Sequence, residues 1–393
     1  MEENGLTVAA LPLRADSSLY ALVLGSREGM KGLLGSRYEQ LERHIDAMEW
    51  AVKPEVGCLI GDAGADVTAR KDDPEQPITL AGQAVRMLHA RWQRKLAGWT
   101  LLPCANLPQN GPHLLEAMIA CAVEWKFPAG FLRWLVEKNR VCSTVTDCAL
   151  WLIETKQPLP VPEVEDAICY VPDLAPYQLR RQRMLGGAGV IVAAAGYLCG
   201  IDTVGGAMRD ELLRQLLGNA LIYEAAPCLP MREEGLRYAA RVCAYLENAC
   251  GDETWPAMGE NLIVRFVACV LPGIAAYEKR NGTLPVCLCF ALSALIMLYA
   301  GVRKNQDGEY VLPGESGEAS VLDAPAALAA FSRMSCDMPP ESLAYAALSD
   351  REVWGADLRE IEGLEDRVTE QLRDMQLLGA RAAMLRAAES CEK

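Results

Sequence analysis

Short apolar runs alternate with segments of helical period along residues 1–155. The apolar runs predict strands, and the second of them, apolar throughout, predicts a central one. The predicted strands are Leu6–Leu13, Leu19–Leu24, Gly57–Ile60 and Thr100–Cys104. Helical periodicity marks the segments Tyr38–Trp50, Thr79–Leu96, 113–126 and 128–139. This alternation predicts an α/β domain built on a parallel sheet.

The pattern changes after a proline-rich connector that begins near residue 156. Long helical periods then continue almost to the end, with prolines between them. The longest apolar stretch, Val286–Gly301, is shorter than the roughly 20 residues that a membrane span needs, so it predicts a buried helix. We therefore expect an α/β domain at 1–155 and a mostly α-helical domain at 156–393.

Composition and charge narrow the function classes. Hydrophobic residues make up 51% of the chain and charged residues 23%, a globular balance. The net charge of −14 would repel nucleic-acid phosphates and anionic membrane surfaces. The acidic residues Glu2 and Glu3 stand where a signal peptide is basic, so we expect a cytoplasmic protein.

The fifteen cysteines are scattered, with Cys287 and Cys289 as the one close pair and no CxxC spacing. With three histidines beside them, they form no zinc-like motif. We expect no metal site and interpret most of these thiols as small, buried core residues.

Four stretches, in this order, resemble the tagaturonate reductase (altronate oxidoreductase) branch of the long-chain mannitol dehydrogenase family. They are Leu101–Asp147, Leu174–Met208, Val270–Gly301 and Asp350–Val368. The ordered set, rather than any single motif, carries the resemblance. It implies a Rossmann-like N-terminal domain and an α-helical C-terminal domain with the site between them. It also implies NAD as the family's cofactor, in oxidation and reduction at a CH–OH group of a sugar or uronate.

Family members begin with a strand and a glycine-rich turn, GxGxFxR, whose backbone approaches the pyrophosphate at a helix N-terminus. In this sequence Leu6–Leu13 aligns with the family's second strand. We therefore expect a truncated, incomplete Rossmann-like sheet and no cofactor binding. The segment Gly187–Gly189 only mimics such a turn, because its helical flanks predict a buried helix.

The resemblance also identifies the family's catalytic helix, which presents Lys, then Asn five residues on, then His three further. At about 100° per residue these side chains would fan toward one cavity. The Lys is the general base, and the Asn and His hold the substrate oxygen. The matching positions here are Arg181, Gly186 and Gly189. Arginine stays protonated at neutral pH, and glycine has no side chain to donate a hydrogen bond.

Four residues remain as candidates for residual substrate binding, with a sugar acid as the candidate ligand: Asn106, Asn110, Asp147 and Arg265. An Asn-Gly turn at Asn110–Gly111 explains that loop equally well. A solvated surface position explains Arg265 equally well.

These observations favour a catalytically inactive or severely impaired homologue. The alternative is an active NAD-dependent oxidoreductase that interconverts a keto-uronate (tagaturonate or fructuronate) or a ketose and its hydroxy form, with Tyr177 or Asp147 as the base. A third hypothesis is self-association through an unpaired sheet edge at Leu6–Leu13.

Overall fold

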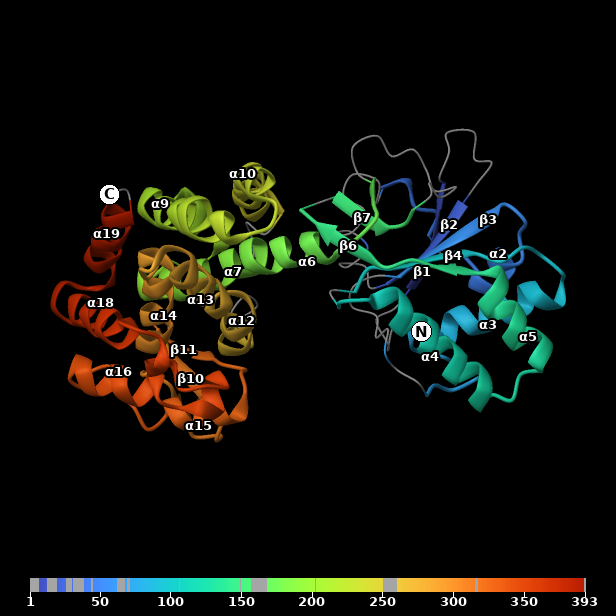
Figure 1. Ribbon diagram of the computed structural model, residues 1–393. Coiled ribbons are helices and arrows are strands. Elements are labelled where there is room, and N and C mark those ends of the chain that lie inside the picture. Colours follow the sequence, from blue (N-terminus) through green and yellow to red (C-terminus); the bar gives the residue numbers. More distant parts are fainter. Residues whose placement is uncertain are drawn as a thin grey trace. The chain divides into compact units, whose positions relative to one another are not determined.

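The computed structural model divides into two compact units, Met1–Gln178 and Leu179–Lys393 (Figure 1). It describes residues 7–12, 20–25, 30, 39–43, 45–61, 68, 71–105, 107–148, 150–156, 168–201, 203–249, 260–314 and 317–391. The division lies later than the predicted boundary at 155/156. Strand β7 (Leu150–Glu154) pairs with β8 (Ile168–Val171), and this pairing keeps the chain through residue 171 in the first unit.

A five-stranded sheet forms the centre of the first unit, in the order β1-β2-β3-β4-β5. Its strands are β1 (Thr7–Pro12), β2 (Tyr20–Gly25), β3 (Val56–Gly61), β4 (Thr100–Pro103) and β5 (Arg140–Val141). The four predicted strands are therefore confirmed, with β2 inside the sheet. Strands β2 to β5 run parallel, whereas β1 is antiparallel to β2. A fully parallel sheet was wrong at this edge, because residues 13–19 are too few for the crossover that parallel neighbours need.

Side chains alternate between the two faces of this sheet. One face, with Leu22, Leu59 and Leu101, packs against the helices. These helices are α2 (Ala47–Ala51), α3 (Leu80–Gln93), α4 (Asn110–Glu124) and α5 (Ala129–Lys138), seen in Figure 1. The other face packs against Trp151 and Ile153 of β7. Strand β7 lies between β6 (Thr144–Asp147) and β8 in a separate three-stranded sheet.

The predicted helix Tyr38–Trp50 was wrong at residues 41–43 and 45–46, which are not helical. The backbone of Glu42 pairs with Ala10 instead, through N–O distances of 2.8 and 3.0 Å. The helix begins only at Ala47, where the Asp46 carboxylate accepts the amides of Met48 and Glu49. The same bridge partly covers the outer side of β1, so the edge predicted to be unpaired has a partner at Ala10.

The second unit is mostly helical, as predicted. Helix α6 (Ala175–Arg181) leads into it and continues as the π-helix η2 (Gln182–Gly186) and helix α7 (Gly187–Leu198). Further elements are α8 (Val204–Arg209), α9 (Glu211–Asn219), the π-helix η3 (Ala220–Ala225), the 3-10 helix η4 (Ala226–Cys228), α10 (Arg232–Ala249), α12 (Leu262–Cys269) and α13 (Leu271–Asn281). They are followed by α14 (Val286–Tyr299), β9 (Arg303–Lys304), β10 (Tyr310–Gly314), β11 (Gly317–Ser320), α15 (Pro325–Phe331), α16 (Pro340–Leu348), α17 (Arg351–Trp354), the 3-10 helix η5 (Leu358–Glu360), α18 (Leu364–Leu378) and α19 (Ala380–Cys391).

Helix α14 is the buried helix expected at Val286–Gly301, and it packs against α7, α18 and α19. Helix α7 is buried over Gly187–Gly196, which confirms that Gly187–Gly189 belongs to a helix. Among the described residues, no helix combines the length and apolarity that crossing a membrane would require.

Candidate active site

The three predicted catalytic positions lie on one continuous helical segment. Arg181 ends α6, Gly186 ends η2, and Gly189 lies in the first turn of α7. We expected the side-chain directions of a regular α-helix, and this expectation was wrong between Arg181 and Gly186. Residues 182–186 form a π-helix, whose i→i+5 hydrogen bonds turn the chain less per residue. Such bulges occur often at functional sites, and this one falls between the positions of the family's Lys and Asn.

Helix α12 packs closely against Gly186. A Cβ atom added there would lie 2.8 Å from Cys269 Sγ, nearer than real Cβ contacts come. The next glycine, Gly187, is less restricted, since its added Cβ would meet Val270 at 3.7 Å. The Cys269 thiol therefore takes the space into which an asparagine at position 186 would extend.

The segment is also tied to the end of α12 by hydrogen bonds. Arg183 Nη1 donates to the carbonyls of Ala268 and Cys269, at 2.8 and 3.4 Å, and Gln182 Nε2 donates to Ala268 at 3.1 Å. The last carbonyls of a helix have no partner within it, and cations there are stabilised by the helix dipole. The polar side chains of Gln182 and Arg183 thus act as a cap for α12.

The charges of three arginines act on the Cys269 thiol, and we call Arg181, Arg183 and Arg265 the arginine cluster. Burial raises the pKa of Cys269, and the charges of Arg265, Arg183 and Arg181 oppose that rise without cancelling it. The structure thus brings together Arg181, Gly186 and Arg265 from the sequence prediction. Arg183 and Cys269 were missed.

A small cavity adjoins this cluster. Its volume is about 130 Å³, below the roughly 300–1,000 Å³ of common ligand pockets. The lining is mostly apolar and contains Leu179, Arg183, Ala225, Cys228, Leu229, Cys269, Val270, Pro272, Gly273, Ala276 and Leu288. Arg183 is the charged side chain at this wall.

The neighbouring Arg180 has a different environment. Its guanidinium is 4% exposed, lies 3.0 Å from a Glu234 carboxylate oxygen and stacks over the Tyr238 ring at 4.3 Å. This arginine fixes α6 to α10 and does not belong to the cluster around Cys269.

Asn110 has a structural role in the described chain, and its role in substrate binding stays a prediction. The side chain is fully buried, and its Nδ2 donates to the carbonyls of Pro103, Ala105 and Thr144 at 2.8–2.9 Å. Its Oδ1 accepts the Thr144 amide at 3.0 Å. The expected Asn-Gly turn is absent as well, because both residues lie in the first turn of α4. A Cβ added at Gly111 would meet the Ser143 backbone nitrogen at 2.6 Å, so glycine allows this close approach.

The other sequence candidates have varied positions. Asp147 ends β6 and is 1% exposed. Tyr177 is half-buried against an apolar cluster of the first unit that contains Val171 and Leu174. Arg265 is half-buried on α12. Asn106 lies outside the described residues.

The order of the strands in the first unit bears on cofactor binding. Rossmann-type cofactors bind where the strand order of a parallel sheet reverses. From β1 to β5, neighbouring strands are consecutive in sequence, and no reversal occurs. At the end of β3, Leu80 packs against Gly61, where an added Cβ would lie 2.3 Å from its Cδ2.

Side chains of the protein itself occupy the N-termini of α2 and α3. The Asp72 carboxylate accepts the amides of Ile78 and Thr79, at 3.1 and 2.8 Å, just before α3. The Thr79 hydroxyl caps the Gly82 amide at 3.0 Å. Asp46 caps α2 in the same manner. A pyrophosphate at either end would meet a carboxylate.

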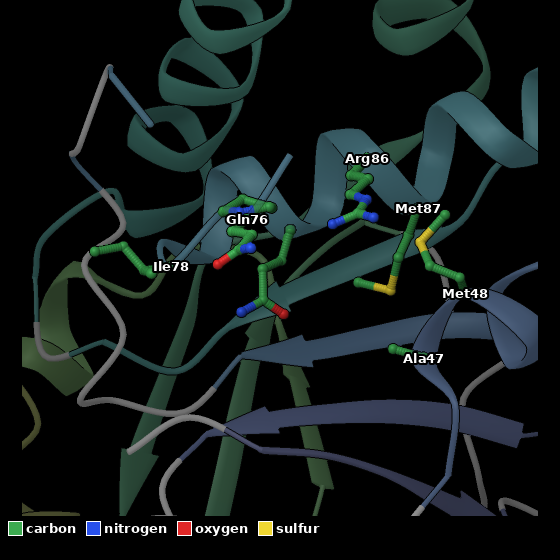
Figure 2. A pocket seen from close by; sticks show the side chains of 8 residues that line it. Ala47, Met48, Gln76, Ile78, Arg86 and Met87 are labelled. Carbon is green, nitrogen blue, oxygen red and sulfur yellow. The ribbon is translucent and has the colours of Figure 1, made fainter. Parts of the chain in front are cut away.

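The first unit has a pocket of about 260 Å³ between α2 and α3 (Figure 2). Its lining residues are Ala47, Met48, Gln76, Pro77, Ile78, Gln83, Arg86 and Met87. Arg86 already donates to the Glu75 carbonyl. No glycine occurs among these lining residues, so the pocket does not resemble a phosphate-binding turn.

Comparison with known proteins supports the resemblance. The altronate oxidoreductase of Yersinia pestis is 28% identical over 347 residues, which cover 78% of this chain and 71% of that protein. The enzyme of the same name from Pectobacterium atrosepticum is 27% identical over 350 residues, with 78% and 71% covered.

Two solved structures share the fold. Substrate-free D-sorbitol dehydrogenase has a TM-score of 0.64 at 17% identity, covering 86% of this chain and 76% of its own. Pseudomonas fluorescens mannitol 2-dehydrogenase, in a ternary complex with NAD and D-mannitol, has a TM-score of 0.57 at 14% identity, covering 98% and 83%. The family described as mannitol dehydrogenase C-terminal domain matches residues 173–376, just over half of the chain. The sequence resemblance is therefore confirmed, and the protein belongs to the mannitol dehydrogenase family, on its altronate oxidoreductase branch.

Proposed function

We propose that this protein is a non-catalytic member of its family, with neither oxidoreductase turnover nor NAD binding. The observation that carries this proposal is the packing at Gly186. The Cys269 thiol lies 2.8 Å from a Cβ built at that position, where the family has its asparagine. The loss of the side chain is thus accompanied by tight packing that takes up its space, which supports a scaffold without the chemistry.

The remaining groups supply no base in this region of the second unit. Removal of a hydride from CH–OH requires a group that accepts the hydroxyl proton. Arg181 keeps its proton at neutral pH. Burial raises the pKa of Cys269, so that thiol stays protonated as well. Gly186 and Gly189 donate nothing to a substrate oxygen.

The sheet supports the second part of the proposal. Its described strands follow one another without the reversal that creates a cofactor crevice. The Asp72 carboxylate already occupies the N-terminus of α3. These features favour a protein that does not bind NAD, the dinucleotide present in the mannitol 2-dehydrogenase structure.

The test measures cofactor binding and turnover separately. NADH fluorescence and thermal shift with NAD(H) are expected to show no binding, and NADH consumption with tagaturonate, fructuronate and a ketose panel is expected to stay at background. The Yersinia pestis altronate oxidoreductase is the positive control. A micromolar dissociation constant for NADH would overturn the cofactor claim. Turnover that disappears in Tyr177→Phe or Asp147→Asn would establish the active alternative.

The arginine cluster favours a second function, the binding of a sugar acid without reaction. Three guanidinium groups act on one thiol, and Arg183 reaches the wall of the adjoining cavity. Guanidinium groups suit carboxylates, so an aldonate or uronate is the ligand class that this charge would select.

Calorimetry with altronate and with uncharged mannitol tests this binding. Altronate is expected to bind and mannitol not to bind. Arg265→Met should weaken the altronate affinity at least tenfold, whereas the exposed Arg237→Met on α10 should leave it unchanged. Equal binding of both ligands, or no binding of altronate, would contradict the sugar-acid function without affecting the non-catalytic proposal.

A further inference from the structure

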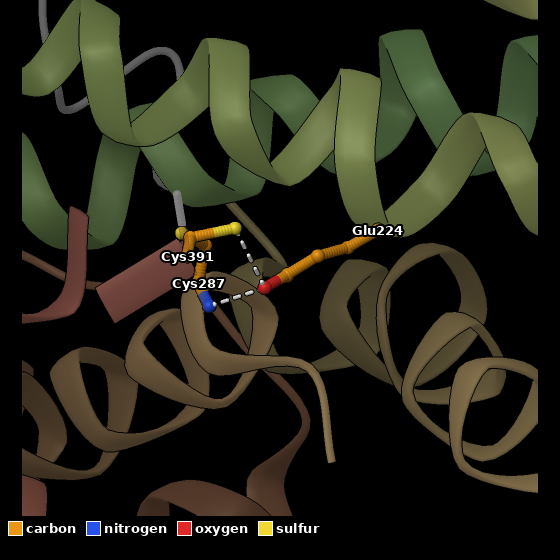
Figure 3. A group of neighbouring side chains, drawn as sticks. All are labelled: Glu224, Cys287 and Cys391. Atoms are coloured by element: carbon orange, nitrogen blue, oxygen red, sulfur yellow. Dashed lines mark hydrogen bonds between the residues drawn. The ribbon is translucent and has the colours of Figure 1, made fainter. Parts of the chain in front are cut away.

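Three side chains with metal-binding atoms converge inside the second unit. Glu224 comes from η3, Cys287 is the second residue of α14, and Cys391 ends α19. Their ligand atoms all lie within 4.8 Å of one another (Figure 3). The sequence analysis missed this group and expected no metal site, because the three residues are far apart in the chain and form no spaced motif.

The carboxylate of this group is buried and held in a fixed orientation. Glu224 is 1% exposed. Its Oε1 accepts the Cys287 amide and its Oε2 accepts the Leu288 amide, both at 2.8 Å. It therefore caps the N-terminus of α14 from a neighbouring element. Each carboxylate oxygen has two lone pairs, so these two bonds leave acceptor capacity on both.

The two thiols extend the same network. Cys391 Sγ donates to Glu224 Oε1 at 3.5 Å, and Cys287 Sγ lies 4.0 Å from the Ala387 carbonyl. A metal ion would replace the thiol proton between Cys391 and Glu224, which is a position already shared by a donor and an acceptor. Cys287 is fully buried, whereas Cys391 is partly accessible and leaves a route for an ion.

The dimensions and charge of the group suit a thiophilic divalent cation. Zn–S and Zn–O bonds of about 2.3 and 2.0–2.2 Å place tetrahedral ligands about 3.5–4 Å apart, so the side chains would close in only slightly. Two thiolates, one carboxylate and Zn²⁺ give a net charge of about −1, which the N-terminus of α14 would stabilise. The positive end of the α14 dipole thus matches the negative charge of the zinc-loaded site.

We propose that Glu224, Cys287 and Cys391 form a zinc site that joins the C-terminal helix α19 to α14 and η3. Water would complete a four-coordinate shell. The role is structural, because the three ligands come from three packed elements. A contact near this site already ties α19 to α9, since Asn219 Nδ2 donates to the Ala388 carbonyl at 3.0 Å. Zinc would add a second connection near the end of α19.

The experiment uses the full chain, reduced, stripped with a chelator and then incubated with Zn²⁺ alone. Bound zinc is measured by elemental analysis after gel filtration, and its affinity by competition with a chromophoric chelator. One zinc per chain is expected, with a thermal midpoint that rises on loading. Co²⁺ should give a thiolate-to-cobalt charge-transfer band, which reports ligation directly.

Two variants and a control decide the assignment. Cys391→Ser should weaken zinc affinity at least 100-fold and remove the charge-transfer band while leaving the fold intact by circular dichroism. Glu224→Gln should weaken zinc affinity at least tenfold. Cys336→Ser, at an exposed cysteine, should bind like the parent protein. The proposal fails if the parent retains no zinc, if Cys391→Ser retains it equally, or if intact mass shows a Cys287–Cys391 disulfide in its place.

Discussion

Two helical glycines of this protein differ in whether their surroundings leave space for a larger side chain. Gly111 and Gly218 both lie in helices, yet their surroundings differ. A Cβ at Gly111 would meet the Ser143 backbone, whereas one at Gly218 would meet nothing within 4 Å. Backbone cannot rotate away as a side-chain end can, so residue identity at Gly111 is set by packing.

The pair Gly111→Ala and Gly218→Ala should therefore shift stability in opposite directions. Gly111→Ala is expected to lower the free energy of unfolding by about 2–3 kcal/mol through overpacking. Gly218→Ala should raise it by about 0.5–1 kcal/mol, because alanine loses less backbone entropy in a helix. Urea unfolding followed by circular dichroism measures both, and a stabilising Gly111→Ala would contradict the packing described here.

His89 is expected to make the stability of the protein depend on pH. Its ring stacks on Phe127 at 4.0 Å between centroids and meets Phe131 edge-on at 5.0 Å. Burial lowers the pKa of His89, so the folded state favours the neutral ring. Its contribution to stability is present above the unfolded pKa of about 6.5 and is lost as pH falls through the lower folded value.

Replacement of this ring should remove that dependence. Between about pH 7.5 and 5, the parent protein is expected to lose stability relative to His89→Phe, which keeps the stacking without a proton. Parallel curves for the parent and His89→Phe in urea unfolding at several pH values would show that His89 does not titrate in this range.

At the scale of elements, the sequence predicted what depends on local periodicity. The spacing of apolar residues correctly predicted strands β1 to β4 and helices α3, α5 and α14. This spacing can be read within each segment alone, without knowledge of its partners. Contacts between distant segments could not be predicted in this way. Glu42 pairs with Ala10, and this pairing replaced the predicted helix around it.

The candidate site shows the same limit. The resemblance to the family identified the positions of Arg181, Gly186 and Arg265. Cys269 was missed because it packs against Gly186, which is far away in the sequence. The π-helix at 182–186, which packs against α12, was also missed, because the segment was expected to be a regular α-helix.

A double-mutant cycle tests that fit between η2 and α12. Gly186→Ala alone should lose about 1–2 kcal/mol, because its Cβ would lie 2.8 Å from Cys269 Sγ. In a Cys269→Ala background the same change should be neutral or stabilising, which gives a coupling of about 1–2 kcal/mol. Gly187→Ala, which meets Val270 only at 3.7 Å, is the matched control and should show coupling below about 0.5 kcal/mol.

For the whole molecule, the order of the strands limits what the first unit can bind. A dinucleotide fold places its first strand in the middle of the sheet, next to the point where the order reverses. Here β2, β3 and β4 are each paired on both sides within the described sheet. A further strand could join only at an edge, and at β1 that edge is already bridged by Glu42.

We therefore expect that an added cofactor loop would not give this protein NADH binding or tagaturonate reduction. We predict that a chimaera carrying the glycine-rich strand, turn and helix of the Yersinia pestis enzyme before residue 7 neither binds NADH by fluorescence titration nor reduces tagaturonate. The same segment returned to the Yersinia enzyme after its deletion should restore both, which controls for the graft itself. If the chimaera binds NADH, the sheet has opened to accept a central strand and the argument from strand order is wrong. Even then, turnover is not expected, since Arg181, Gly186 and Gly189 still provide no base for the hydroxyl proton.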